Sequence, residues 1–307
     1  MATLSNTDIL LFSQAAGTGR EENDKRNKQR EFVLVELFNG RCDAFCADSS
    51  YGVAWTHLKT EFTSALQHIA TLEGLTDATS IHVKQKGGRG FNYDFAITYR
   101  TSSGEQEVHV EFKYGGTSVD SLPEFFNAAA DKPFHADLYA SYFYKSTLPQ
   151  LAALYNITVP LPSEADYVKH IHKNKPSLPF LVALDTAERA DTDKSPSSKY
   201  AQKRSLVAAS ITAYLESSID STNFSTIEAE LKRSQGKKRY LLYNNRTFHH
   251  DALKPEELEL EHTAYIKNGN TLVIQTKQEG TSIAMLLRWK NHLGILFPAW
   301  QISMTRA

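Results

Sequence analysis

Two carboxylates and a lysine lie in segments whose other residues have the pattern of core strands. Asp94 belongs to "NYDFAITYR", and Glu111 and Lys113 belong to "EVHVEFKYGG". In both segments apolar residues recur at every second position, which is typical of strands whose side chains point alternately to two faces. If the two strands pair, one face packs on the core and the other gathers Asp94, Glu111 and Lys113.

Two carboxylates beside an amine suit a hard divalent cation. Mg²⁺ prefers oxygen ligands and is commonly held by one or two carboxylates together with phosphate oxygens of a substrate. Asp94 and Glu111 would supply two ligands, and the backbone carbonyl of Phe112 would add a third. Such an ion stabilises charge on a phosphoryl group and lowers the pKa of a bound water, while Lys113 would orient that water or neutralise a phosphate oxygen. The residues therefore predict a phosphodiester-cleaving site that uses Mg²⁺, for which Mn²⁺ would substitute.

The surrounding pattern predicts the elements that position these groups. Apolar residues at helical spacing predict an amphipathic helix over residues 55–72, which Gly74 ends. Residues 80–114 predict a three-stranded meander with a Gly-rich turn. Helices are expected at 121–130, 136–155, 200–219 and 225–239, and strands fill the last quarter of the chain. Residues 17–31 are charged throughout and are expected to form an exposed arm or a solvated first turn.

Asp94, a gap of sixteen residues (95–110) and then Glu111-Phe112-Lys113 resemble the PD-(D/E)XK nuclease superfamily. The preceding helix and the meander also resemble the common core of that fold, over about residues 55–145. The resemblance implies that Asp94 and Glu111 bind metal and that Lys113 is the catalytic lysine. A helix carboxylate often joins such sites, and Glu61 is the candidate. The chain departs from the family in having Asn92-Tyr93 where the motif's proline is expected.

The predicted fold class is therefore α/β (α+β): a restriction-endonuclease-like central mixed sheet flanked by helices, with a β-rich C-terminal region. Residues 1–150 are expected to hold the N-terminal arm and the nuclease core. Residues 151–200 are punctuated by prolines and predict a loop-rich connection or insertion. Residues 201–307 are expected to be helical and then β-rich, and to contribute to DNA binding.

Basic residues mark three segments that would contact nucleic acid. The glycines of "KQKGGRG" allow close approach of a phosphate backbone, and Arg and Asn side chains in "LLRWKNH" are suited to reading base edges. An ordinary turn with solvated charges explains "KQKGGRG" equally well, and the third segment, "LKRSQGKKR", is typical of a solvated helix end. Trp289 and Trp300 are expected to pack in the core. The candidate contacts are Lys84, Lys86, Arg89, Lys237, Lys238, Arg239, Arg288, Lys290 and Asn291.

Composition limits the class of protein without choosing a function. The 307 residues are 41% hydrophobic and 22% charged with a net charge of −1, as in an ordinary globular protein. Cys42 and Cys46 are the only cysteines, and they complete no zinc pattern. No segment has the length of a membrane helix or the pattern of a signal peptide, so an intracellular protein, cytoplasmic or nuclear, is expected.

The resemblance suggests a site-specific endonuclease that acts on double-stranded DNA, and a homodimer if it cuts both strands of a palindrome. Two alternatives stay open at this stage. One is a nucleic-acid-binding protein without catalysis, in which the charges of the two strands form a solvated sheet face with cross-strand ion pairs. The other is a nuclease of the same fold that acts on branched DNA or RNA.

Overall fold

The computed structural model describes residues 4–13, 20–87, 91–121, 126–173, 175–193 and 195–306. The chain forms two compact units, one of residues 1–122 with 231–254 and the other of residues 123–230 with 255–307. This division differs from the boundaries at 150 and 200 expected from the sequence, because residues 238–244 return to the first unit and pair there with the meander. Loop composition does not reveal a strand that returns from far along the chain.

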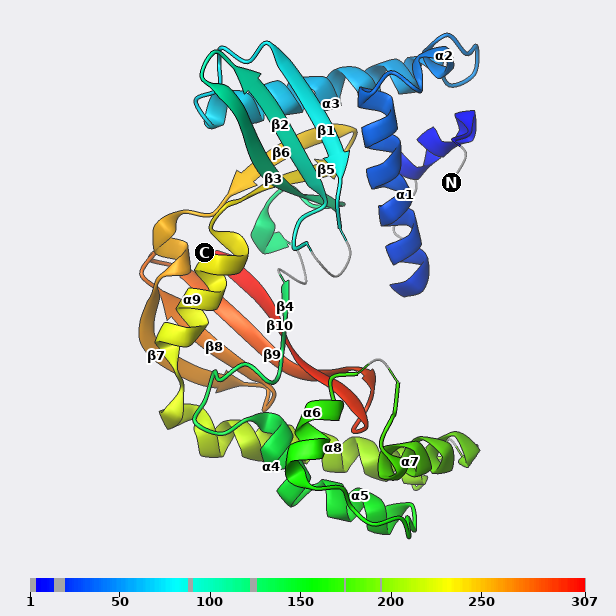
Figure 1. The fold of residues 1–307 in the computed structure, drawn as a ribbon, viewed down its shortest axis with the longest axis vertical. Coiled ribbons are helices and arrows are strands. Elements are labelled where there is room, and N and C mark those ends of the chain that lie inside the picture. The colour runs from blue at the N-terminus through cyan, green and yellow to red at the C-terminus, as the bar shows by residue number, and fades with distance from the viewer. Residues whose placement is uncertain are drawn as a thin grey trace. The chain divides into compact units, whose positions relative to one another are not determined.

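The first unit is built on a mixed sheet with the strand order β1-β2-β3-β5-β6 (Figure 1). The three strands of the meander, β1, β2 and β3, are antiparallel as predicted, and β5 joins β3 in parallel before turning into β6. The elements are η1 (Asn6–Phe12), α1 (Arg20–Phe38), α2 (Asp43–Cys46), α3 (Gly52–Leu72), β1 (Ser80–Gln85), β2 (Phe95–Thr101), β3 (Gly104–Tyr114), η2 (Val119–Ser121), β5 (Lys238–Asn244) and β6 (Thr247–Ala252).

One face of this sheet packs against α3, the helix predicted at 55–72. Phe62 is fully buried and its ring contacts Phe95 of β2 and Phe248 of β6, with ring centroids 6.2 and 5.5 Å apart. Truncating such a core phenylalanine to alanine costs about 3–5 kcal/mol. The helix begins at Gly52, where a Cβ atom would lie 2.5 Å from the carbonyl oxygen of Cys46. Only glycine permits that close approach, so the start of α3 is fixed by packing.

From residue 20 on, the charged segment before Phe32 is helical rather than an exposed arm, and residues 17–19 fall outside the described residues. Residues 20–31 are the first part of α1, which contacts β1 and β3. Its side toward the sheet includes two charged residues that are nearly inaccessible to solvent, Arg30 and Glu31. The Arg30 guanidinium lies 3.5 Å from the centroid of the Tyr114 ring and donates a hydrogen bond to the carbonyl of Leu11. The sequence lacks an apolar stripe here because this side of the helix is buried through polar contacts.

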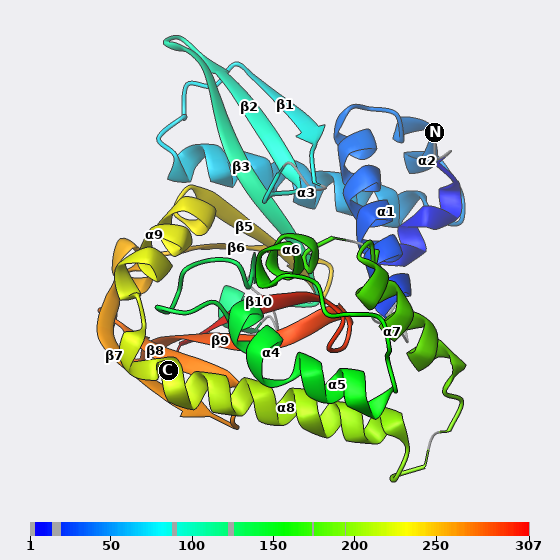
Figure 2. The same ribbon diagram turned by 60° about the horizontal axis from the view of Figure 1, so that its bottom comes forward.

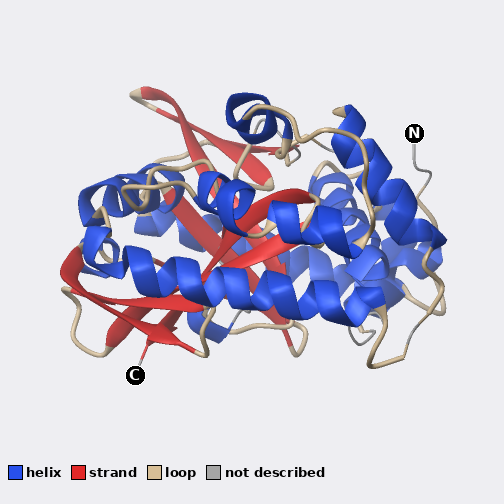
Figure 3. Ribbon diagram, turned by 90° about the horizontal axis from the view of Figure 1, so that it is seen from below, coloured by secondary structure: helices blue, strands red, loops and turns tan. Residues whose placement is uncertain are grey.

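The second unit contains an antiparallel sheet with the order β4-β10-β9-β8-β7. Figure 2 shows α8 running alongside this sheet next to α4 and α5, and Figure 3 shows the helices lying across its strands. The elements are β4 (Phe126–Ala129), α4 (Tyr139–Ser146), α5 (Leu148–Leu154), α6 (Glu164–His170), α7 (Pro179–Ala190), α8 (Lys199–Ser218), η3 (Ile219–Ser221), α9 (Phe224–Gln235), η4 (Pro255–Leu258), β7 (Leu260–Lys267), β8 (Thr271–Thr276), β9 (Thr281–His292) and β10 (Leu296–Arg306). The last residues of α9, from 231 on, are counted with the first unit.

Trp289 and Trp300 pack in the core of this unit, as expected from the sequence. Their exposed fractions are 8% and 1%. Trp289 contacts Phe143 of α4 at a centroid distance of 4.7 Å, and its indole N–H donates to the hydroxyl of Tyr139. Buried indoles need such a partner for the N–H group. The mixed α/β composition predicted for the chain is thus observed in both units.

Two expectations about secondary structure are wrong. Residues 126–129, expected to be helical, form the edge strand β4, because they pair with residues 299–302 of β10. Residues 151–200, expected to be loop-rich, contain the end of α5 and all of α6 and α7. Pro179 occupies the first turn of α7, as Pro149 does in α5 just before this region, and the missing N–H is tolerated there. These prolines start helices rather than interrupting them.

Within the described part of the chain, none of the helices combines the length and the apolar character needed to cross a membrane.

Candidate active site

Asp94 and Glu111 meet where β2 and β3 pair. The last register pair of these strands is Phe95 with Val110, so Asp94 directly precedes it and Glu111 directly follows it. The backbone N–H of Asp94 donates to the carbonyl of Val110 at 3.0 Å. The Oδ2 atom of Asp94 accepts a hydrogen bond from the N–H of Phe112 at 2.9 Å. The strand pairing thus fixes both the backbone and the carboxylate of Asp94 beside β3.

Glu111 is held by two lysines. Its Oε1 atom lies 2.6 Å from the Lys113 ammonium, and its Oε2 atom lies 3.1 Å from the Lys238 ammonium. The side chains of Glu111 and Lys238 are 13% and 5% exposed, whereas Lys113 is 29% exposed. Lys238 comes from β5, which pairs in parallel with β3. Lys113 is therefore the cation of the pair that is more open to a substrate, and Lys238 is the more deeply buried one.

A third carboxylate, Glu31 of α1, belongs to the same electrostatic group. Burial raises the pKa of Glu31, and the charge of Glu111 raises it further while Lys113 lowers it. Its Oε2 atom accepts a hydrogen bond from the Gln85 amide of β1 at 3.2 Å. Glu31 lies in the segment that the sequence describes only as charged. Its role is visible once α1 is placed beside β1 and β3.

The carboxylates of this site differ in charge state for clear reasons. Burial raises the pKa of Asp94 to about 7, and repulsion from Glu111 and Glu31 adds to the effect. Burial alone would raise the pKa of Glu111 as well, but the charges and hydrogen bonds of Lys113 and Lys238 outweigh it and lower that pKa. One carboxylate is thus neutralised by lysines, and the other lies in a negative potential that Lys113 offsets only in part.

That potential is the feature that fits a divalent cation. A cation placed at Asp94 would relieve the repulsion between the carboxylates. The site offers few oxygen ligands, which matches an ion such as Mg²⁺ that keeps water ligands and binds substrate phosphate. The carbonyl of Phe112 lies on the same side of β3 as its N–H, which points to Asp94. Among residues 4–306 as far as they are described, no three His, Cys, Asp or Glu side chains lie close enough to hold a metal by themselves. Oxygens from the backbone, water and substrate would complete the coordination.

The structure places Glu61 elsewhere. It lies on α3, where it interacts electrostatically with Tyr243. Tyr243 belongs to the apolar cluster between the sheet and its covering helices. The helix carboxylate that interacts with Glu111 is Glu31 of α1.

Strand alternation separates the basic residues of "KKR". Lys237 is exposed just before β5, Lys238 is buried against Glu111, and Arg239 forms an ion pair with Glu73. The run is not a solvated helix end, since α9 stops at Gln235 and the charges enter a strand whose successive side chains point to opposite faces. Of the three, Lys237 alone has the exposed position expected for a phosphate contact.

Near the meander turn, Lys84 and Lys86 remain available for contacts. Lys84 is exposed and pairs in register with Ala96, which in turn pairs with His109, so its side chain shares the face of Glu111. Lys86 lies over the ring of Phe91, with its ammonium 4.7 Å from the ring centroid. Arg89 falls outside the described residues.

Arg288, Lys290 and Asn291 lie on β9 of the second unit. Arg288 and Lys290 alternate with the buried Leu287 and Trp289, so they point to the sheet face opposite α8. The side chain of Asn291 falls outside the described residues. The role of these residues as DNA contacts remains a prediction.

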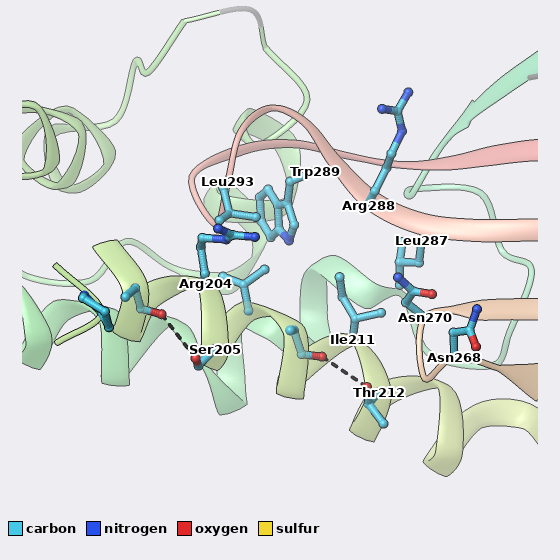
Figure 4. Close-up of a pocket in the computed structure, with 14 residues that line it drawn as sticks. Arg204, Ser205, Ile211, Thr212, Asn268, Asn270, Leu287, Arg288, Trp289 and Leu293 are labelled. Carbon is cyan, nitrogen blue, oxygen red and sulfur yellow. Dashed lines mark hydrogen bonds between the residues drawn. The ribbon is translucent and has the colours of Figure 1, made fainter. Parts of the chain in front are cut away.

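A cavity of about 670 Å³ lies in the second unit, between α8, strand β9 and the turn that joins β7 to β8 (Figure 4). In the figure Arg204 extends toward Trp289 and Leu293, whereas Arg288 points away from the cavity. Its described lining holds no carboxylate, histidine or cysteine. It therefore lacks the groups for acid, base or metal chemistry, and we assign the candidate active site to Asp94 and Glu111 despite the size of this cavity.

No family model matches this chain, and a search of curated proteins finds no significant match. The assignment of a function therefore depends on the geometry of the site.

Proposed function

We propose that the chain is a Mg²⁺-dependent nuclease of the PD-(D/E)XK type that hydrolyses phosphodiester bonds of DNA. The observation that carries this proposal is the incompletely compensated negative potential at Asp94, beside a Glu111 already neutralised by Lys113 and Lys238. On a solvated sheet face the side chains would be exposed, and water would screen their charges. Here they are partly buried, and they come from two neighbouring strands with Glu31 as a third contributor.

Each residue has a role that follows from its position. Asp94 and Glu111, with the carbonyl of Phe112, would hold Mg²⁺, which supplies charge neutralisation at the phosphoryl group and an acidified water. Lys113, as the more exposed cation, would donate hydrogen bonds to a phosphate oxygen or to the attacking water. Lys238 keeps Glu111 ionised and holds its Oε2 atom, while the Oε1 atom lies beside the more exposed Lys113. Mn²⁺ would substitute for Mg²⁺.

Site-specific cutting of double-stranded DNA, and a homodimer that matches a palindromic site, belong to this proposal through the resemblance of the motif. A non-catalytic nucleic-acid-binding protein and a nuclease for branched DNA or RNA are the alternatives. Each predicts a different outcome with a panel of nucleic acids.

The test is incubation of the purified chain with supercoiled plasmid, linear duplex, single-stranded DNA, branched DNA and RNA. Each substrate is tested with Mg²⁺, with Mn²⁺ and with EDTA. We expect cutting of DNA with either metal and none with EDTA. Intact DNA under all metal conditions would refute the proposal, and cutting of RNA alone would favour the alternative substrate.

A further inference from the structure

Three aromatic side chains form a continuous row beside Asp94 and Glu111. We call Phe91, Tyr93 and His109 the aromatic row. The rings of Tyr93 and His109 are stacked, with centroids 3.9 Å apart and planes 9° apart. The Phe91 ring meets Tyr93 edge to face at 5.5 Å and 63°. Tyr93 is 8% exposed, whereas Phe91 is 45% exposed. The row therefore ends in an apolar ring that is open to solvent.

Hydrogen bonds fix the inner part of the row. The Nε2 atom of His109 pairs with the Glu107 carboxylate at 2.9 Å, which sets the orientation of the imidazole. The carbonyl of Tyr93 accepts the N–H of Gly87 at 3.0 Å. Phe91 thus packs against two rings whose positions are fixed by hydrogen bonds. This contact orders the Phe91 ring before any ligand binds.

The row is adjacent to the proposed site. His109 lies two residues before Glu111 on the same face of β3, a spacing of about 7 Å along a strand. Tyr93 immediately precedes Asp94 in the chain. The row therefore starts next to the two carboxylates and leads away from them to Phe91.

The charges around the row match a nucleic acid. The Lys86 ammonium lies 4.7 Å from the Phe91 centroid, and Lys84 is exposed on the face shared with His109. An aromatic ring flanked by cations is the arrangement with which proteins bind single strands, since bases stack on the ring and cations contact the phosphates. Bases within a duplex are already stacked on each other and present no free ring face. An exposed ring at this position favours a strand with an unpaired base.

We propose that Phe91 stacks on an unpaired base of the DNA strand held at Asp94 and Glu111, so that the substrate is single-stranded at or next to the cleaved bond. This inference rests on the proposed nuclease function, and within it favours a single-stranded or branched substrate over the duplex substrate that the resemblance of the motif suggests.

The test is a binding measurement that involves no cleavage. Fluorescence anisotropy with Ca²⁺ or EDTA would compare a labelled single strand of about 12 nucleotides with a hairpin duplex. Stacking of one base contributes about 1–3 kcal/mol, so Phe91→Ala should weaken single-strand binding by about 5- to 150-fold. Phe91→Trp should retain the affinity, and duplex binding should change less than twofold.

A matched control is Tyr265→Ala, which removes an aromatic ring of similar exposure, 51%, from the second unit. It should leave both affinities unchanged. The inference is overturned if Phe91→Ala binds single strands like the wild type, or if it weakens single-strand and duplex binding equally.

The two proposals fail in different ways. A wild type that cuts DNA, with Phe91→Ala binding unaltered, refutes the stacking role and leaves the nuclease. A wild type that binds single strands through Phe91 but never cuts refutes the nuclease and leaves the base contact.

Discussion

Replacing Asp94 by asparagine should stabilise the metal-free protein. The asparagine side chain would keep an oxygen that accepts the N–H of Phe112 and would remove the charge that Glu111 and Glu31 repel. The pKa of Asp94 is about 7 in the folded protein, against 3.8 for an ordinary aspartate. A raised folded-state pKa means that stability is fully present below pH 3.8 and is lost as the pH rises to about 7.

The size of the effect follows from that difference. At about 1.4 kcal/mol for each pH unit between the two pKa values, ionised Asp94 destabilises the fold by at most about 4 kcal/mol above pH 7. The asparagine amide needs a hydrogen-bond acceptor of its own, which offsets part of the gain. We therefore expect Asp94→Asn to raise the free energy of unfolding by about 2 kcal/mol at pH 8 in EDTA, and by less at pH 5.

Urea denaturation followed by fluorescence measures this difference. The matched control is Glu105→Gln, on the neighbouring strand β3 and on the same sheet face as Glu111, with a side chain that is 57% exposed and paired with Arg100. It should change stability by less than about 0.5 kcal/mol. Mg²⁺ at ten times its Kd should stabilise the wild type by about 1.4 kcal/mol and leave Asp94→Asn unchanged. An Asp94→Asn variant no more stable than the wild type at pH 8 would refute the electrostatic account of the site.

Three further predictions concern neighbouring groups. Lys113→Met should abolish DNA cutting while anisotropy shows DNA binding retained; loss of binding as well would make Lys113 a simple phosphate contact. Lys238→Met should lower the free energy of unfolding in urea by about 2–3 kcal/mol, near the lower end for breaking a buried ion pair because Lys113 still neutralises Glu111; an unchanged stability would contradict the buried pairing. Burial lowers the pKa of His250 to about 4 from 6.5, with His68 and His249 adding to the effect. The difference of about 2.5 pH units corresponds to at most about 3.4 kcal/mol. Because solvent screens this partly buried group, we expect its protonation to cost the fold about 2 kcal/mol as the pH falls from 6.5 to 4. His250→Gln should flatten that part of the stability profile, and an identical profile would contradict this assignment.

Local patterns predict the part of the site that lies on consecutive elements. Alternation in two neighbouring strands places Asp94 and Glu111 together, and helical spacing predicts the α3 that covers the other face. A meander needs only short-range pairing, so its register is contained in residues close in sequence. The sequence therefore predicts the two carboxylates, Lys113 and the surface on which they lie.

Long-range contacts are not predictable in the same way. Glu31 joins the site because α1 packs beside β1 and β3, and Lys238 joins it because β5 returns to β3 after more than a hundred residues. Neither neighbour has a signal in a single sequence. Glu61 has the residue type expected for a helix carboxylate, but it lies on the helix that covers the apolar face. Whether the third carboxylate of the site comes from α1 or from α3 depends on how the helices pack on the sheet, which the periodicity of the sequence does not indicate.

The edge strand β4 shows the same limitation. Its residues 126–129 include helix-forming alanines, yet pairing with β10 decides their conformation. Pro179 belongs to the region that its prolines predict to be loop-rich. A proline starts a helix when it lies in the first turn and interrupts one when it lies in the interior, and Pro179 lies in the first turn of α7.

The most direct test of the account is the rate at which supercoiled plasmid and single-stranded DNA are cut in Mg²⁺ by the wild type and by Lys113→Met and Asp94→Ala variants purified in parallel. The account predicts metal-dependent cutting by the wild type and a loss of at least about a hundredfold in both variants, with the fold retained by circular dichroism. Equal cutting by all three proteins, or no cutting by the wild type with Mg²⁺ or Mn²⁺, would contradict the claim that these residues form a nuclease site.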